Sequence, residues 1–149
     1  VAARIMSRRD ASDPDLVDML RGAGIVYLFG DSPMHLRSVL KDTPAWHAML
    51  DQLAGGGVIA ASAGAAAGLC DPMVDPRGGA YTLGLGLVGP LALVTQSETW
   101  SGERLKRTLE LANGFPVATM PSGSALVRTA DGWDRIGGVE IHGGELPAV

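Results

Sequence analysis

Residues 57–67 read Gly57-Val58-Ile59-Ala60-Ala61-Ser62-Ala63-Gly64-Ala65-Ala66-Ala67, and this stretch decides the fold. Its first half, Val58 to Ala61, is a short apolar run that predicts a buried strand, and the small residues after Ser62 are suited to opening a helix. A serine at such a junction lies at the carboxyl end of a strand, where α/β sheets bind their ligands. The pattern corresponds to a nucleophile elbow, G-x-S-x-G, with Ala60 in place of the first glycine. The alternative interpretation is a strand-to-helix packing corner without chemistry.

The segments before this stretch alternate between helix and strand. Proline at the first helical position, preceded by a capping side chain, marks two of the predicted helix starts. In chain order we expect a weak strand over Val1 to Met6, a helix from Asp13-Pro14 to Gly22 or Gly24, a buried parallel strand over Ile25 to Phe29, a turn at Gly30-Asp31-Ser32-Pro33 with a helix to about Leu40, and a helix from Thr43-Pro44 to Gly55.

The segments after this stretch are richer in strands. We expect an irregular loop over Cys70 to Gly79, a packed turn over Leu83 to Leu87, a strand over Leu91 to Thr95, a helix capped by Ser101 that runs to about Asn113, and strands over Val117 to Met120, Ser124 to Thr129 and Val139 to His142, with a hairpin turn at Asp131-Gly132 between the last two. This order predicts one α/β domain over residues 1–149, with a mostly parallel sheet flanked by helices and an antiparallel C-terminal edge.

Composition excludes several classes of function. The net charge of −4 disfavours a nucleic-acid partner. The one cysteine, Cys70, forms no internal disulfide, and the histidines are too scattered for a metal site, so we expect no metal and no cofactor. No apolar run is long enough to span a membrane, and no signal peptide is visible, so we expect a cytoplasmic protein.

Several motifs, in order, resemble those of the peptidase E and cyanophycinase family of serine peptidases. They are Tyr27-Leu28-Phe29-Gly30-Asp31, Thr43-Pro44-Ala45-Trp46, Ala61-Ser62-Ala63-Gly64-Ala65, Leu83-Gly84-Leu85-Gly86-Leu87, Glu98-Thr99-Trp100 with Arg104-Leu105-Lys106-Arg107, and Gly123-Ser124-Ala125-Leu126-Val127. The resemblance implies a class I glutamine amidotransferase-like fold.

The catalytic residues of that family carry over only in part. The resemblance implies that Ser62 is the nucleophile, that Gln96 occupies the position of the family's histidine, and that Ser122 occupies the position of its acid. Ser97 or Glu98 takes the histidine position if the loop shifts in register. A glutamine amide cannot accept the serine proton near neutral pH, and a serine without a base is a poor nucleophile.

We therefore expect a catalytically impaired or inactive peptidase homologue that retains a small ligand pocket at Ser62. The backbone N–H groups of Gly30 and Ala63 would form an oxyanion hole, and Asp31 follows that turn as a ligand-binding candidate or a helix cap. The expected ligand is a small molecule or a short acidic peptide. The alternatives are an active Asp-directed exopeptidase with a non-standard base, and a structural or partner-binding module.

Family members begin with a further strand and helix before the region that matches Val1. Their absence would leave unpaired strand edges and an uncovered apolar face along Ile25 to Phe29 or Val58 to Ala61. We expect a homodimer, or association with the segment that is missing here.

Overall fold

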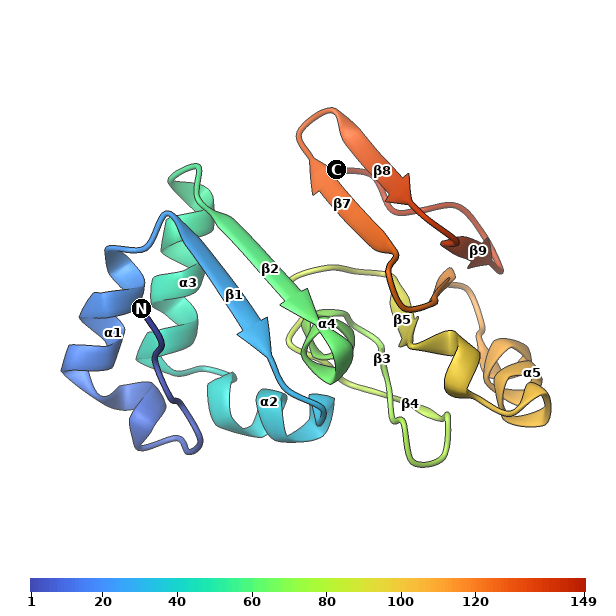
Figure 1. Ribbon diagram of the computed structural model, residues 1–149, viewed down its shortest axis with the longest axis horizontal. Helices are drawn as coiled ribbons and strands as arrows, with labels where there is room; N and C mark the ends of the chain where they lie inside the picture. Colours follow the sequence, from blue (N-terminus) through green and yellow to red (C-terminus); the bar gives the residue numbers. More distant parts are fainter.

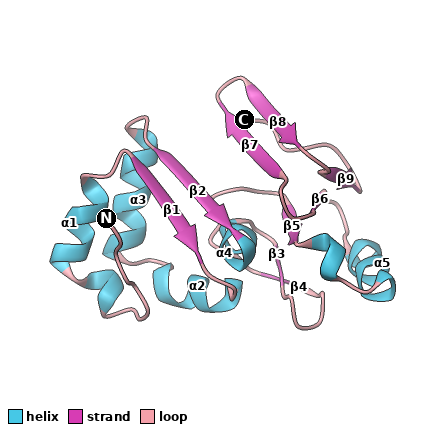
Figure 2. Ribbon diagram, viewed as in Figure 1, coloured by secondary structure: helices cyan, strands magenta, loops and turns pink.

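The computed structural model describes residues 1–149, and helices alternate with strands along the first half of the chain (Figures 1 and 2). The helices are α1 (Pro14–Arg21), α2 (Pro33–Leu40), α3 (Pro44–Ala54), α4 (Ala63–Leu69) and α5 (Gly102–Leu111), with short 3-10 turns η1 (Asp10–Ser12) and η2 (Ser97–Thr99). The strands are β1 (Ile25–Phe29), β2 (Val58–Ser62), β3 (Met73–Val74), β4 (Tyr81–Thr82), β5 (Ala92–Thr95), β6 (Val117–Met120), β7 (Ala125–Thr129), β8 (Gly132–Ile136) and β9 (Glu140–His142).

The mixed α/β class is confirmed, but the parallel strands do not form one continuous sheet. β1 pairs with β2 in parallel, and β5 pairs with β6 in parallel, without hydrogen bonds between the two pairs. β9 joins β6 in the antiparallel sense, which confirms the antiparallel C-terminal edge. The remaining strands form two small antiparallel pairs, β3 with β4 and β7 with β8.

Side-chain caps explain where most of the helices begin. Asp13 accepts hydrogen bonds from the first amides of α1, Thr43 caps α3, and Ser101 caps α5, as the sequence predicts. At α2 the cap is Ser32, whose Oγ accepts from the His35 amide at 3.2 Å. The interpretation of Asp31 as a helix cap is therefore wrong.

Four predictions about the flanking segments are corrected by the structure. Residues Val1 to Met6 form no strand. The predicted loop after Cys70 contains β3, and α5 ends two residues before Asn113. The turn at Asp131-Gly132 joins β7 to β8, a strand that sequence reasoning missed, while β9 pairs with β6 instead. Tertiary pairing decides these short segments, because their local patterns are too weak to select a partner.

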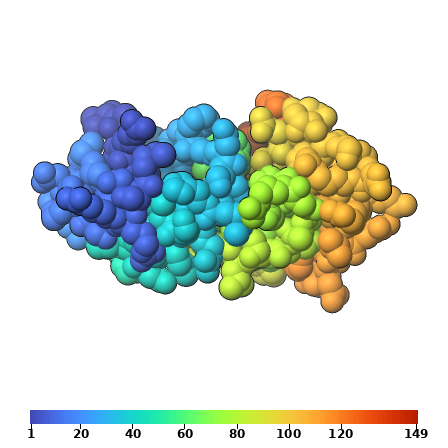
Figure 3. All heavy atoms as spheres, turned by 90° about the horizontal axis from the view of Figure 1, so that it is seen from below, coloured from blue at the N-terminus to red at the C-terminus, as the bar shows by residue number.

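The buried side chains form three clusters along the long axis of the molecule. The largest holds α1, α3 and the inward face of β1 together and includes Trp46 and Met49. The two smaller clusters pack the α4 end and β3 against β5, β6 and α5, and include Cys70, Val94 and Ala118. The first half of the chain therefore lies at one end of the molecule and residues from about 90 onward at the other (Figures 1 and 3).

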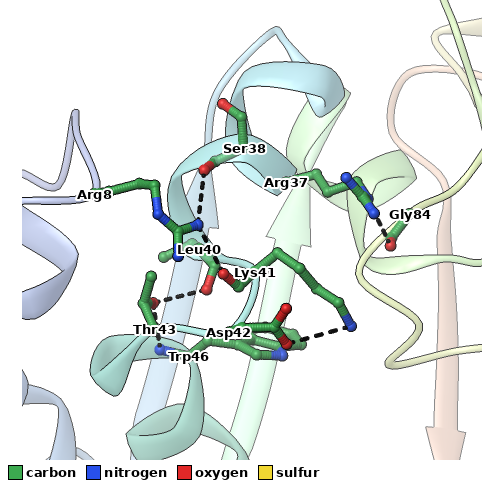
Figure 4. Close-up of polar contacts among 9 residues, drawn as sticks. All are labelled: Arg8, Arg37, Ser38, Leu40, Lys41, Asp42, Thr43, Trp46 and Gly84. Carbon is green, nitrogen blue, oxygen red and sulfur yellow. Dashed lines mark hydrogen bonds and ion pairs between the residues drawn. The ribbon is translucent and has the colours of Figure 1, made fainter.

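Polar contacts fix the connection between α2 and α3 (Figure 4). The Arg8 guanidinium donates to the carbonyl oxygens of Ser38 at 3.2 Å and Lys41 at 2.8 Å, near the C-terminal end of α2. Thr43 donates to the Leu40 carbonyl at 2.7 Å while it caps α3. These bonds hold the helices that support β1 and β2. None of the helices is both long enough and apolar enough to cross a bilayer.

Candidate functional site

Ser62 is the last residue of β2, and the chain turns into α4 directly after it. The predicted strand-serine-helix order is therefore present. Ser62 is extended at φ −135°, whereas the next residue, Ala63, has φ +52°. A non-glycine residue in the left-handed region costs conformational energy and is typical of functional turns. Ser62 thus lies on a strained strand-to-helix turn, with the left-handed residue at Ala63.

Gly64 brings the start of α4 into contact with the turn after β1. A Cβ atom at Gly64 would lie 2.1 Å from the carbonyl oxygen of Asp31, so no other residue fits this backbone. Next to this contact, the Ala65 amide donates to the Gly30 carbonyl at 2.8 Å. The structure thus places Gly30 and Asp31 beside the turn from Ser62 into α4, which we call the elbow. That the amides of Gly30 and Ala63 hold an oxyanion stays a prediction.

The Ser62 side chain has one hydrogen-bond partner within the protein, the phenol of Tyr27. The Tyr27 hydroxyl donates to Ser62 Oγ over 2.7 Å. The register of β1 and β2 explains the contact, because Phe29 lies opposite Ser62 and Tyr27 opposite Ala60, so these side chains share one face of the strand pair. Sequence reasoning missed Tyr27, although its position two residues before Phe29 marks it as facing the same side.

No histidine bonds to Ser62. His35 and His47 lie on α2 and α3, and both are exposed. His142 lies on β9, where its Nε2 is 3.0 Å from Thr119 Oγ1 and 3.7 Å from a Glu140 carboxylate oxygen. A neutral phenol is not a general base, so the hydroxyl of Ser62 has no base among its hydrogen-bond partners.

Gln96 follows the end of β5 in a left-handed conformation, with φ +51°. Its carbonyl accepts from the Thr99 amide at 2.9 Å and from the Thr99 hydroxyl at 2.8 Å, which builds the turn η2. Its exposed side chain lines a cavity of about 200 Å³ between α4, β5 and the start of α5, shared with Asp31, Gly64 and Trp100. Three segments that carry predicted site residues therefore meet at this cavity: the turn after β1, the start of α4 and the end of β5.

Arg104, on α5, is the basic residue that lines this cavity. Its guanidinium carbon lies 3.9 Å from the centre of the Trp100 ring, and one terminal nitrogen donates to the Pro76 carbonyl at 3.1 Å. Its Nε is buried and has no hydrogen-bond partner. Stacking on Trp100 holds the Arg104 side chain in the cavity wall.

Ser122, which the resemblance predicts at the position of the family's acid, bonds to a carboxylate from η2. The Ser122 amide donates to Glu98 oxygens at 3.1 and 3.2 Å, and the Ser122 hydroxyl donates to Glu98 Oε1. The hydroxyl bond, with the backbone amides of Glu98 and Ser122, lowers the pKa of the Glu98 carboxyl below its usual value. Neither residue bonds to Ser62 or lines the cavity. The assignment of Ser122 to the position of the family's acid stays a prediction.

The structure was also searched for a reactive cysteine and for a metal site. Cys70 is 1% exposed, and burial raises the pKa of its thiol to about 12, which disfavours the reactive thiolate. No group of three or more His, Cys, Asp or Glu side chains lies close enough to hold a metal ion.

The sequence matches no family model and no curated protein. The structure does match solved ones. It superposes on the crystal structure of a peptidase from an acI-B1 actinobacterium with a TM-score of 0.79 and 20% sequence identity, and the match covers 99% of this chain and 68% of that chain. The likeness shows a shared peptidase-like fold.

Proposed function

We propose that this chain, whose fold is peptidase-like, is a catalytically impaired or inactive serine-peptidase homologue that binds a small ligand beside its elbow. The single observation that carries the proposal is the hydrogen bond from the Tyr27 phenol to Ser62 Oγ, in the place where a base would be needed. A serine protease that lacks a triad member keeps only a residual rate, about 10³–10⁴-fold over water. Hydrolysis of Asp-X dipeptides is therefore expected to be negligible.

The cavity beside the elbow supports binding as the retained role. Arg104 presents a buried Nε without an acceptor, and a buried unpaired donor costs about 1–3 kcal/mol, which a bound carboxylate would recover. Guanidinium groups are well suited to carboxylates. Asp31 lines the same cavity and carries the opposite charge. An occupant with both a carboxylate and an ammonium group, such as a short acidic peptide, complements this pair.

Isothermal titration of the chain with the dipeptide Asp-Ala tests the binding. Arg104→Gln is expected to weaken binding at least tenfold. The matched control is Lys106→Gln, which removes the same charge from the exposed side of α5 and lies outside the cavity. Equal affinities of the two variants, or no binding to the unsubstituted chain, would remove the support for a peptide ligand.

A fluorophosphonate probe tests the catalytic half of the proposal. Without an activating base, Ser62 is expected to label no faster than in Ser62→Ala, where the probe has no target at this position. Turnover of Asp-X dipeptides at about 1–10³ s⁻¹, abolished in Ser62→Ala, would contradict the proposal.

The second candidate function is an active exopeptidase with a non-standard base. The observation behind it is the distance of 2.7 Å between the Tyr27 and Ser62 hydroxyls, over which Tyr27 would accept the serine proton if its phenol were ionised. Probe labelling of Ser62 that disappears in Tyr27→Phe would support this candidate over the first.

A further inference from the structure

Residues 75–80 join β3 to β4 (Figure 1), and we call this loop the strap. Pro76 lines the cavity beside the elbow from the strap, and Val74, at the end of β3, lines it from directly before the strap. The strap is therefore one wall of the site proposed above. Pro76, Arg77 and Ala80 are exposed, and two further strap residues are glycines, so apolar packing contributes little to the position of the strap.

Three side chains of α5 hold the strap against the helix. Their spacing, at 104, 107 and 108, places them on one side of α5. Each of them donates a hydrogen bond to a backbone carbonyl of the strap: Arg104 Nη1 to Pro76 at 3.1 Å, Arg107 Nη2 to Gly78, and Thr108 Oγ1 to Gly79 at 2.9 Å. Polar contacts with α5 therefore set the position of the strap.

The strap is held more firmly at one end than at its tip. At Gly79 the bond to Thr108 is buried, and a Cβ atom there would lie 2.2 Å from Thr108 Oγ1, so this end is packed against α5. The bonds to Pro76 and Gly78 are exposed. Exposed hydrogen bonds with little apolar packing around them belong to the parts of a fold that open most easily. Residues 76–78, the tip of the strap, are therefore the part that opens at the lowest cost.

Arg104 connects the tip to the binding site. Its guanidinium carbon lies 3.9 Å from the centre of the Trp100 ring, one terminal nitrogen bonds to the Pro76 carbonyl, and its buried Nε has no acceptor. The Pro76 carbonyl thus helps to orient the group that would bind a carboxylate. When the tip opens, the cavity loses the Pro76 wall and the guanidinium loses this acceptor.

We propose that the strap closes over the occupant of the cavity, so that the occupant binds only when the strap is closed. The inference rests on the proposed function and adds a regulation of the same site. A ligand that binds one of two states shifts the population toward that state, so ligand and closed strap stabilise each other. Arg107 is then a positioning residue, because it bonds to the strap and does not line the cavity.

Limited digestion with trypsin measures the opening of the strap. Arg77, in the tip, has a side chain that is 77% exposed, is paired with Asp75 at 2.7 Å and precedes a glycine. Arg21, at the end of α1, is a matched internal reference, because it is 61% exposed, is paired with Asp18 at 2.8 Å and also precedes a glycine. Mass spectrometry follows cleavage after each arginine. At low trypsin concentration the rate reports the population of the open form.

The first comparison needs no ligand. Arg107→Gln removes a charged hydrogen bond from the tip, a loss that corresponds to about tenfold faster cleavage after Arg77. The matched control is Lys106→Gln, which removes the same charge from a side chain that is 76% exposed and pairs with Glu110 instead of the strap. Arg107→Lys keeps a donor and is expected to lie between the two. Equal cleavage after Arg77 in Arg107→Gln and Lys106→Gln would overturn the proposal.

The second comparison uses the unsubstituted chain and the dipeptide Asp-Ala, and it decides the matter if Arg107→Gln unfolds and is cleaved faster after Arg21 as well. Asp-Ala at about ten times its dissociation constant is expected to slow cleavage after Arg77 about tenfold and to leave cleavage after Arg21 unchanged. Calorimetric binding of Asp-Ala without this protection overturns the closing strap and leaves the proposed function standing. No binding of Asp-Ala overturns both.

Discussion

Gly64→Ala tests whether the contact between the elbow and the turn after β1 is as close as the structure makes it. The added Cβ would lie 2.1 Å from the Asp31 carbonyl oxygen, 2.4 Å from its carbonyl carbon and 3.0 Å from the Gly30 carbonyl oxygen. All of these are backbone atoms, so α4 or the turn must move. Overpacking of this kind costs about 1–3 kcal/mol. The shift also weakens the bond from the Ala65 amide to Gly30, and an unpaired buried group costs about 1–3 kcal/mol more.

Thermal unfolding followed by circular dichroism, at one fixed protein concentration, measures the effect. For a chain of this length, about 1 kcal/mol corresponds to roughly 2–4 °C in Tm, so Gly64→Ala is expected to lower Tm by roughly 5–15 °C. The control is Gly102→Ala at the start of α5, where nothing lies within 4 Å of the added Cβ. Alanine is the better helix former there, so its Tm is expected to stay equal or rise slightly. Equal melting of the two variants would refute the close approach.

Three further predictions concern other parts of the chain. The folded pKa of Glu98 is depressed, chiefly by the Ser122 hydroxyl. The stability that this carboxylate contributes is therefore present above the unfolded pKa of about 4.5 and is lost as the pH falls through the folded pKa. Glu98→Gln is expected to flatten the acid side of a curve of unfolding free energy against pH, and an unchanged curve would contradict this. Cys70, with its pKa raised to about 12 by burial, is expected to resist iodoacetamide at about pH 8 until denaturant is added, and rapid native alkylation would show that the core opens there. The resemblance assigns Gln96 and Ser122 to the positions of the family's histidine and acid. Dipeptidase activity is therefore expected in the double variant Gln96→His with Ser122→Glu and in neither single variant. Activity in a single variant would refute the assignment.

The sequence correctly predicts the helices whose first turn is capped by a side chain just before it. Asp13, Thr43 and Ser101 cap the helices that the sequence predicts them to cap, and Gly22 follows the last residue of α1. These interactions join residues that are neighbours in the chain, so the sequence contains both partners. The same reasoning located the strand-serine-helix turn at Ser62, because the apolar run and the small residues after it are contiguous.

Short strands were harder to place from the sequence. β8 was missed and β9 was assigned to the wrong neighbour, although the turn between β7 and β8 was recognised. A strand of three to five residues gains its stability from the strand beside it, and the sequence does not state which strand that is.

The sequence by itself determined the mixed α/β class, the helix starts and the position of Ser62 at the end of a strand. Only the tertiary structure decided which side chain meets Ser62, because the partnership with Tyr27 depends on the register of two strands and joins residues 35 positions apart in the chain. It also decided that Arg104 turns into a cavity wall and that one face of β1 and β2 stays uncovered. Such contacts join segments distant in sequence, and their geometry is set by packing of the whole molecule rather than by local preference.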